Sequence, residues 1–127
     1  MVVEDFVSFR NFVCSKLKQR PELQVICEVS DGLEAVQKAE ELQPDLILLD
    51  IGLPTLNGIE VARRVRELAP KSKIIFLSQE TSPDFVKHAL VLGALGYIFK
   101  THAEGDLLMA IDAILSGRLF VSGAQAK

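Results

Sequence analysis

Two hydrophobic periods alternate along the chain. Short runs in which nearly every residue is apolar are separated by longer stretches in which apolar residues recur three or four positions apart. The short runs are typical of strands that are covered on both faces, and the longer stretches are typical of amphipathic helices. Strands are predicted over residues 1–3, 24–29, 46–49, 73–77 and 96–99. Helices are predicted over residues 6–20, between Gly32 and Gln43, and over residues 59–68, 82–92 and 103–115.

Helix-breaking and helix-capping residues stand at the predicted boundaries. Pro21 and Pro70 follow the first and third helices, where a proline cannot continue the hydrogen-bond pattern. Ser82 is predicted to cap the fourth helix, with Pro83 at its first position, and Gly93 is predicted to end that helix.

One apolar stripe on each helix is expected to face the sheet. The predicted stripe residues are Phe9, Val13 and Leu17 in the first helix, Ala35, Ala39 and Leu42 in the second, and Leu108, Ile111 and Leu115 in the last.

The predicted elements follow the order strand–helix, repeated five times. Buried strands that alternate with helices indicate an α/β fold with an open parallel sheet, doubly wound by right-handed crossovers. In such sheets the functional site lies beyond the carboxyl ends of the strands. The residues predicted at those ends are therefore the first candidates for chemistry.

Composition and charge narrow the class of protein. The 127 residues suit one domain, and 49% hydrophobic with 24% charged residues is typical of a folded globular chain. The net charge of −3 does not indicate the basic surface that nucleic-acid binding requires, so we expect no direct nucleic-acid binding by this segment. No signal peptide is recognisable, and the longest apolar run, residues 89–99, is shorter than the roughly 20 residues that a membrane span needs. We therefore expect a cytoplasmic location without membrane contact.

Three carboxylates stand at predicted strand ends. Glu4 and Asp5 follow the first strand, and Asp50 follows the third. If these strands are neighbours, the carboxylates repel one another unless a cation lies between them, and oxygen ligands favour a hard ion such as Mg²⁺. The alternative is that they are unrelated helix caps on separate strands.

Lys100 and Ser78 end two further predicted strands. Beside an acidic cluster, the lysine would be a fixed counter-charge that can hold a phosphoryl oxygen, and the serine hydroxyl could donate to the same group. Each residue alone would be an ordinary surface lysine or loop serine.

Taken together, these residues resemble the receiver domains of two-component response regulators over essentially the whole chain. The motifs are residues 2–5 (VVED), residues 45–54 (DLILLDIGLP), residues 57–58 (NG), Ser78 and residues 93–100 (GALGYIFK). The C-terminal half is most similar to the NarL/FixJ-type subfamily, whose receivers precede a LuxR-type helix-turn-helix. Its markers are the non-proline Thr101, residues 106–111 (DLLMAI) and residues 117–122 (GRLFVS).

The resemblance implies a flavodoxin-like, five-stranded parallel sheet in the order 2-1-3-4-5. It implies that Asp50 accepts a phosphoryl group from a sensor histidine kinase, with Lys100 and Ser78 assisting. Asp5, Asp50 and the backbone carbonyl of Gly52 would bind Mg²⁺, and Glu4 would contribute through water. Such a domain catalyses only its own phosphorylation and dephosphorylation.

The resemblance also implies a switch and a domain division. Ser78 and Tyr97 would be the switch pair, which changes the surface formed by the last two helices and the fifth strand and so controls an output, transcription being the expected one. A homodimer could form through the same surface. The receiver would cover residues 1–117, and residues 118–127 would be a tail or the start of a linker to an output domain absent from this chain.

Two positions depart from the family pattern. Gln79 stands where the family usually has a small residue. Thr101 stands directly after Lys100, where the family often has a proline whose preceding peptide bond is cis. A cis bond before Thr101 would cost roughly 3 kcal/mol, so we expect it to be trans.

Three other interpretations remain. A phosphatase of the haloacid dehalogenase type needs a second acid two residues after the nucleophile, where this chain has Gly52. A nucleotide-binding module needs a glycine-rich loop after the first strand, which is missing. A degenerate receiver would bind partners without being phosphorylated.

Overall fold

The computed structural model describes residues 1–123, which form one α/β unit. Its strands are β1 (Val2–Val3), β2 (Glu28–Val29), β3 (Leu46–Asp50), β4 (Lys73–Ser78), β5 (Gly96–Phe99) and β6 (Phe120–Val121). Its helices are α1 (Val7–Leu17), α2 (Gly32–Leu42), α3 (Gly58–Leu68), α4 (Pro83–Val91), the short 3-10 turn η1 (Lys100–His102) and α5 (Ala103–Leu115).

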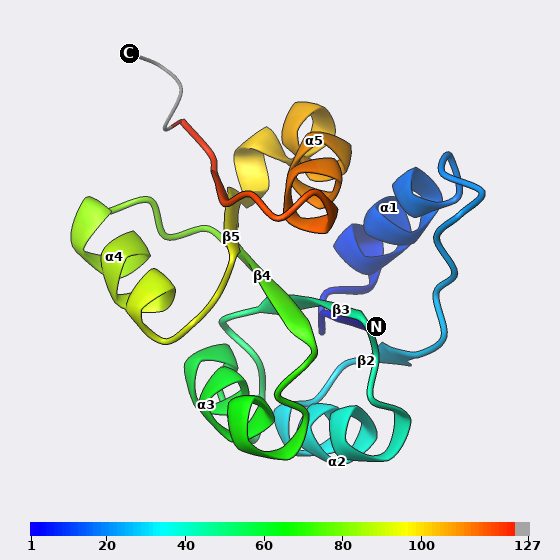
Figure 1. Ribbon diagram of the computed structural model, residues 1–127, viewed down its shortest axis with the longest axis vertical. Coiled ribbons are helices and arrows are strands. Elements are labelled where there is room, and N and C mark those ends of the chain that lie inside the picture. The colour runs from blue at the N-terminus through cyan, green and yellow to red at the C-terminus, as the bar shows by residue number, and fades with distance from the viewer. Residues whose placement is uncertain (124–127) are drawn as a thin grey trace.

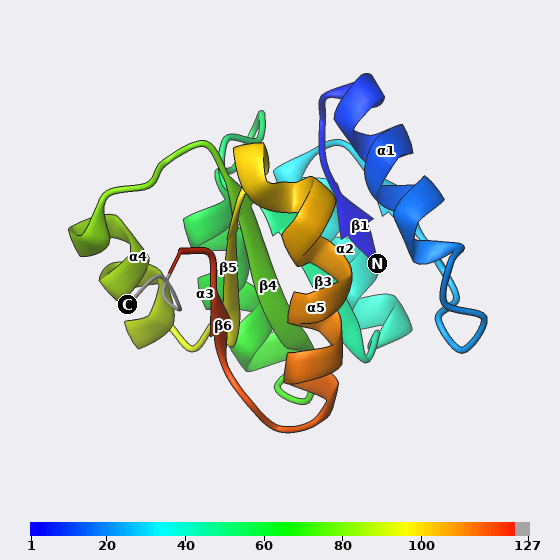
Figure 2. The ribbon, with the colours of Figure 1, turned by 90° about the horizontal axis from the view of Figure 1, so that it is seen from above.

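The strands form a parallel sheet in the order β2-β1-β3-β4-β5-β6. The predicted fold class and the order of the first five strands are confirmed. The strand count differs by one, because Phe120–Val121, which the sequence placed in the tail, pairs with Gly96 and Tyr97 at the edge of β5 (Figure 2). The last part of that predicted tail, residues 124–127, lies outside the described residues.

Helices cover both faces of the sheet (Figure 1). Helices α1 and α5 pack on one face through Val13, Leu17, Leu107, Ile111 and Ile114. Helices α2, α3 and α4 pack on the other face, largely through small or β-branched residues. The central strands β3 and β4 are consequently buried on both sides, as their unbroken apolar sequences predict.

Local signals place both ends of α4 as predicted, whereas α1 ends at Leu17, before the predicted end at Arg20. The Ser82 hydroxyl accepts a hydrogen bond from the amide of Phe85, Pro83 opens α4, and Gly93 follows that helix with a φ of +102°. At α3, the Asn57 side chain accepts from the amide of Glu60. These caps fix the direction of the loops that leave the carboxyl ends of β3 and β4.

Three further predictions are wrong, one about the extent of a strand and two about helix faces. Strand β2 covers only Glu28–Val29, the two residues that pair with Val2 and Val3, and not the whole predicted range 24–29. In α5 the buried stripe contains Leu107, Ile111 and Ile114, whereas Leu115 is 47% exposed. The sequence contains two overlapping stripes that share Ile111, and packing against the sheet selects the other one. Leu42, in the predicted stripe of α2, is also exposed.

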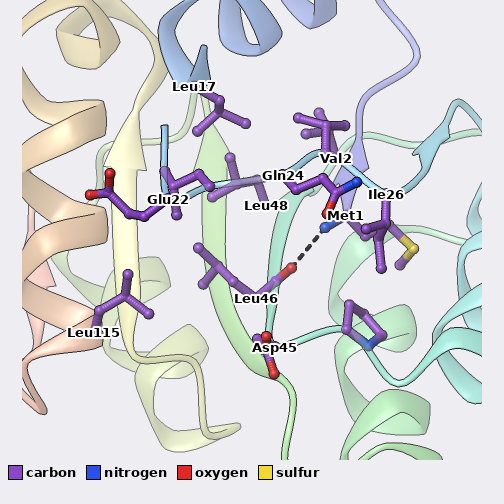
Figure 3. A pocket seen from close by; sticks show the side chains of 13 residues that line it. Met1, Val2, Leu17, Glu22, Gln24, Ile26, Asp45, Leu46, Leu48 and Leu115 are labelled. Atoms are coloured by element: carbon purple, nitrogen blue, oxygen red, sulfur yellow. Dashed lines mark hydrogen bonds between the residues drawn. The ribbon is translucent and has the colours of Figure 1, made fainter. Parts of the chain in front are cut away.

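A pocket of about 360 Å³ lies at the amino-terminal end of the strands. Figure 3 shows Met1 within it, with the amino group donating to the carbonyl of Leu46 at 2.8 Å. Leu17 and Leu115 lie on its wall. This end of the sheet is opposite the predicted site.

None of the helices among residues 1–123 combines the length and apolar character that a membrane span requires.

The α5 packing predicts unequal effects for two chemically identical substitutions. Leu107→Ala should lower the free energy of unfolding by about 2–5 kcal/mol, because it removes a fully buried side chain and leaves a cavity. Leu115→Ala should change it by only about 0.5 kcal/mol, because this side chain is half exposed. Urea unfolding of both variants measures the difference. Equal losses would contradict the observed orientation of α5.

Candidate functional site

The carboxyl ends of β1, β3, β4 and β5 meet at one edge of the sheet. They surround a cleft of about 840 Å³ whose lining includes Glu4, Asp5, Asp50, Ser78 and Lys100. Parallel pairing of Val3 with Leu49 places the acids after β1 beside the acid that ends β3. The cleft therefore gathers the residues that the sequence predicts at strand ends.

Glu4, Asp5 and Asp50 form a compact acidic cluster. One carboxylate oxygen from each lies within 4.8 Å of the others. Glu4 is completely buried, Asp50 is nearly so, and Asp5 is exposed to the cleft. This all-oxygen set, open on one side, fits a hard divalent cation that keeps some of its water.

Lys100 is the counter-charge of this cluster. Its ammonium lies 3.0 Å from Glu4 Oε1 and 3.2 Å from Asp50 Oδ1, and its side chain is mostly buried. Burial alone would lower the lysine pKa, but its hydrogen bond to Glu4 and the charges of Asp50 and Glu4 outweigh burial and raise that pKa. The lysine is therefore held in its charged form.

Burial raises the pKa of both Glu4 and Asp50. Lys100 offsets part of the rise in each case, and the charge of Asp50 adds to the rise for Glu4. The backbone of Gly52, in the loop after β3, also lowers the pKa of Asp50. Desolvation is thus the leading electrostatic cost at this site, and one ammonium does not remove it.

Gly58 lets the helix after this loop begin directly against the acidic strand. Its amide donates to the carbonyl of Ile51 at 2.7 Å. A side chain at this position would collide with the backbone carbonyl of Asp50, so the close approach needs glycine.

Ser78 and Tyr97 meet at the backbone of Glu80. The Ser78 hydroxyl accepts from the Glu80 amide at 2.9 Å, and the Tyr97 hydroxyl donates to the Glu80 carbonyl at 2.7 Å. Tyr97 is fully buried and packs edge-on against Phe76 and Phe99. The ring therefore lies in its inward position, and burial raises the pKa of its hydroxyl.

Residues 1–112 match the family described as the response regulator receiver domain. The chain belongs to the response-regulator receiver family. Among its relatives, it is 32% identical to the transcriptional regulatory protein DegU of Brevibacillus brevis over 95% of this chain and 51% of DegU. It is 33% identical to the nitrate/nitrite response regulator protein NarL of Escherichia coli K12 over 98% of this chain and 57% of NarL. The chain thus spans about half the length of these relatives.

A solved structure supports the same family. The two-component response regulator of the LuxR family from Aurantimonas sp. SI85-9A1 superposes with a TM-score of 0.92 at 32% identity, over 99% of this chain and 90% of that one. The subfamily resemblance predicted from the C-terminal half is confirmed, and the dehalogenase-type and nucleotide-binding interpretations are not supported.

Two receiver residues near the cleft were not predicted as site residues. The Phe9 ring lies 4.8 Å from the Lys100 ammonium, in cation–π geometry. An Arg10 guanidinium nitrogen donates to the backbone carbonyl of Glu4 at 2.8 Å. Phe9 was assigned only to a packing stripe, and a helix residue that contacts a distant strand end has no signature in the sequence.

The peptide bond before Thr101 is trans, as predicted.

The raised pKa of Asp50 predicts a pH-dependent effect of Asp50→Asn on stability. A carboxylate whose pKa is higher in the folded state costs stability as the pH rises through that folded pKa, because ionisation is harder in the folded protein. The amide does not ionise. Without divalent cations, the variant should therefore gain stability relative to the wild type as the pH rises above about 4, the ordinary pKa of an aspartate.

Thermal or urea unfolding across this pH range measures the gain. Asp45→Asn, which changes an exposed acid just before β3, is the control for the loss of a carboxylate outside the cleft. A stability difference for Asp50→Asn that stays constant with pH would contradict the assignment of burial as the leading cause.

Proposed function

We propose that this receiver accepts a phosphoryl group on Asp50 from the phosphohistidine of a sensor kinase, in a reaction that needs Mg²⁺. The observation that carries the proposal is the buried Asp50 carboxylate, 3.2 Å from the Lys100 ammonium and beside Glu4 and Asp5. A nucleophilic carboxylate, a fixed cation and a cation-binding cluster are the parts that phosphoryl transfer uses.

The reaction follows from these positions. A carboxylate oxygen of Asp50 attacks the phosphorus atom, and the phosphorus–nitrogen bond of the phosphohistidine breaks with its electron pair left on the imidazole, which takes up a proton. Lys100 is held charged within reach of the Asp50 oxygen, so it can offset negative charge on the phosphoryl oxygens. The product is an acyl phosphate on Asp50.

The acidic cluster supports the Mg²⁺ part of the proposal. Asp5, Asp50 and the backbone carbonyl of Gly52 would hold the ion directly. Glu4 is buried and paired with Lys100, which favours a contribution through water. When bound, Mg²⁺ neutralises charge on the transferring group and lets three carboxylates ionise together.

The test uses acetyl phosphate as a small donor and intact mass as the measure. Wild-type protein with Mg²⁺ should gain the mass of one phosphoryl group, and Asp50→Asn should gain none. Removal of Mg²⁺ by a chelator should stop labelling of the wild type. Asp45→Asn, an acid at the other end of the same strand, should be labelled normally.

Two outcomes would contradict the proposal. Labelling of Asp50→Asn at the wild-type rate would show that Asp50 is not the acceptor. An unlabelled wild type that still binds Mg²⁺ would favour a degenerate receiver.

We propose that phosphorylation is read on the surface formed by α4, β5 and α5. The Ser78 hydroxyl accepts from the Glu80 amide, and the Tyr97 hydroxyl donates to the carbonyl of the same residue. A movement of Ser78 toward a phosphoryl oxygen on Asp50 would disturb the backbone that also holds Tyr97. A change at Ser78 would therefore reach Tyr97 on β5 and the start of α4. A partner protein, or a second copy of the chain in a homodimer, would sense the altered surface.

Chemical-shift mapping with beryllofluoride, a mimic of the phosphoryl group, tests this readout. We expect shifts at the cleft and also along Pro83–Val91 and Tyr97. In Tyr97→Phe, which loses only the bond to the Glu80 carbonyl, the α4 shifts should become smaller while those at Asp50 remain. Wild-type shifts confined to the cleft would contradict the proposal.

We also propose that the chain is the receiver part of a longer, cytoplasmic transcription factor. The support is that DegU and NarL are about twice as long as the matched segment, and that both are named as regulators. DNA would be bound by a domain after residue 127, since this segment carries a net charge of −3. The gene sequence downstream of Lys127 tests this, and a stop codon just past it would refute the proposal.

A further inference from the structure

Ser122 joins three elements through one buried hydroxyl. It follows β6 and is only 2% exposed. Its hydroxyl oxygen accepts from the amide of Phe99 at 3.0 Å and donates to Asp106 Oδ2 at 2.7 Å. The end of β5, the first turn of α5 and the segment after β6 are therefore connected at a single atom.

The backbone geometry explains why the serine is needed there. The amide of Ser122 donates to the carbonyl of Tyr97 at 2.9 Å, and among residues 1–123 this is the last backbone bond from the segment after α5 to β5. The amide of Phe99 lies beyond that ladder, and the serine side chain supplies the acceptor that the strand no longer provides. A buried amide without a partner is costly, so this replacement stabilises the end of β5.

The bond to Phe99 lies next to the cleft. Phe99 directly precedes Lys100, whose ammonium pairs with Glu4 and Asp50. The turn that begins at Lys100 has no side-chain cap, and neither has α5 after it. Ser122 and Asp106 thus supply side-chain hydrogen bonds that hold the backbone on both sides of this turn.

We propose that Ser122, supported by Asp106, is a positioning residue for Lys100. This inference rests on the proposed phosphoacceptor function, because it assigns the pair to the placement of the ammonium that faces the phosphoryl group. Neither residue lines the cleft or touches the acidic cluster. Their effect reaches the reaction through the backbone of Phe99 and Lys100, and displacement of a charged group by a fraction of an ångström to an ångström can slow a reaction strongly.

The test separates positioning of Lys100 from general loosening of the fold. Ser122→Ala should slow labelling by acetyl phosphate at saturating Mg²⁺ by about tenfold to a hundredfold. Its Mg²⁺ affinity, measured by titration calorimetry, should not fall, because the acids on β1 and β3 are untouched. A variant whose whole site had loosened would lose both labelling and Mg²⁺ affinity.

Three further variants complete the design. Ser122→Thr keeps the hydroxyl and should restore labelling. Ser116→Ala removes an exposed serine just after α5 and should behave like the wild type. Asp106→Asn keeps an acceptor oxygen but loses its charge, so it should cause a smaller loss in the same direction, and it serves as the test if Ser122→Ala does not fold.

Amide exchange in the unphosphorylated protein gives a readout that does not depend on labelling. Ser122→Ala should lose protection at Phe99 and over residues 100–103, while β3 stays protected. Unchanged exchange there, or labelling and Mg²⁺ affinity that fall together, would overturn the inference. A wild type that takes no phosphoryl group would instead overturn the proposed function, and the exchange result would still decide whether Ser122 holds this turn.

Discussion

The pairing of Lys100 with two buried carboxylates is the interaction on which this end of the molecule depends. Glu4 and Asp50 are withdrawn from water at neighbouring strand ends, and each raises the cost of ionising the other. One ammonium, 3.0 and 3.2 Å away, offsets that cost only in part. Negative charge therefore remains uncompensated on the open side of the cluster, where Asp5 faces the cleft. A divalent cation can compensate that charge, and an incoming phosphoryl group can be held between the cation and the lysine.

The parallel sheet is what makes this arrangement possible. Because every strand runs in the same direction, the ends of β1, β3, β4 and β5 reach one edge, and residues far apart in sequence meet there. The loops after β3 and β4 contain Asn57 and Ser82, which cap the helices that follow. The absence of a side chain at Gly58 lets α3 begin directly against the Asp50 carbonyl. The scaffold thus fixes the charges before any ligand arrives, so little reorganisation is needed when charge develops.

Much of the fold and the cleft could be predicted from the sequence, because both depend on local signals. Unbroken apolar runs mark strands covered on both faces, and the residue after each run marks a strand end, which is enough to bring Glu4, Asp50, Ser78 and Lys100 together. The face of α5 could not be predicted, since two stripes sharing Ile111 are equally regular and only packing selects between them. Strand β6 has two residues and takes its stability from the edge of β5. The contact of Phe9 with Lys100 joins a helix to a strand end far along the chain and leaves no local pattern.

The edge strand β6 makes residues 120–122 part of the folded core, although the sequence places them in a tail. By composition, the residues after Gly117 look like the start of a linker, and Arg118, Leu119 and Gly123 are exposed. Yet Val121 packs beside Tyr97, and Ser122 is bonded to the backbone that carries Lys100. Coupling between two sites is reciprocal in free energy, so a ligand that tightens the lysine end of β5 also tightens the hold on β6. In the proposed role of Ser122, the placement of β6 and the placement of Lys100 therefore depend on the same short hydrogen bonds.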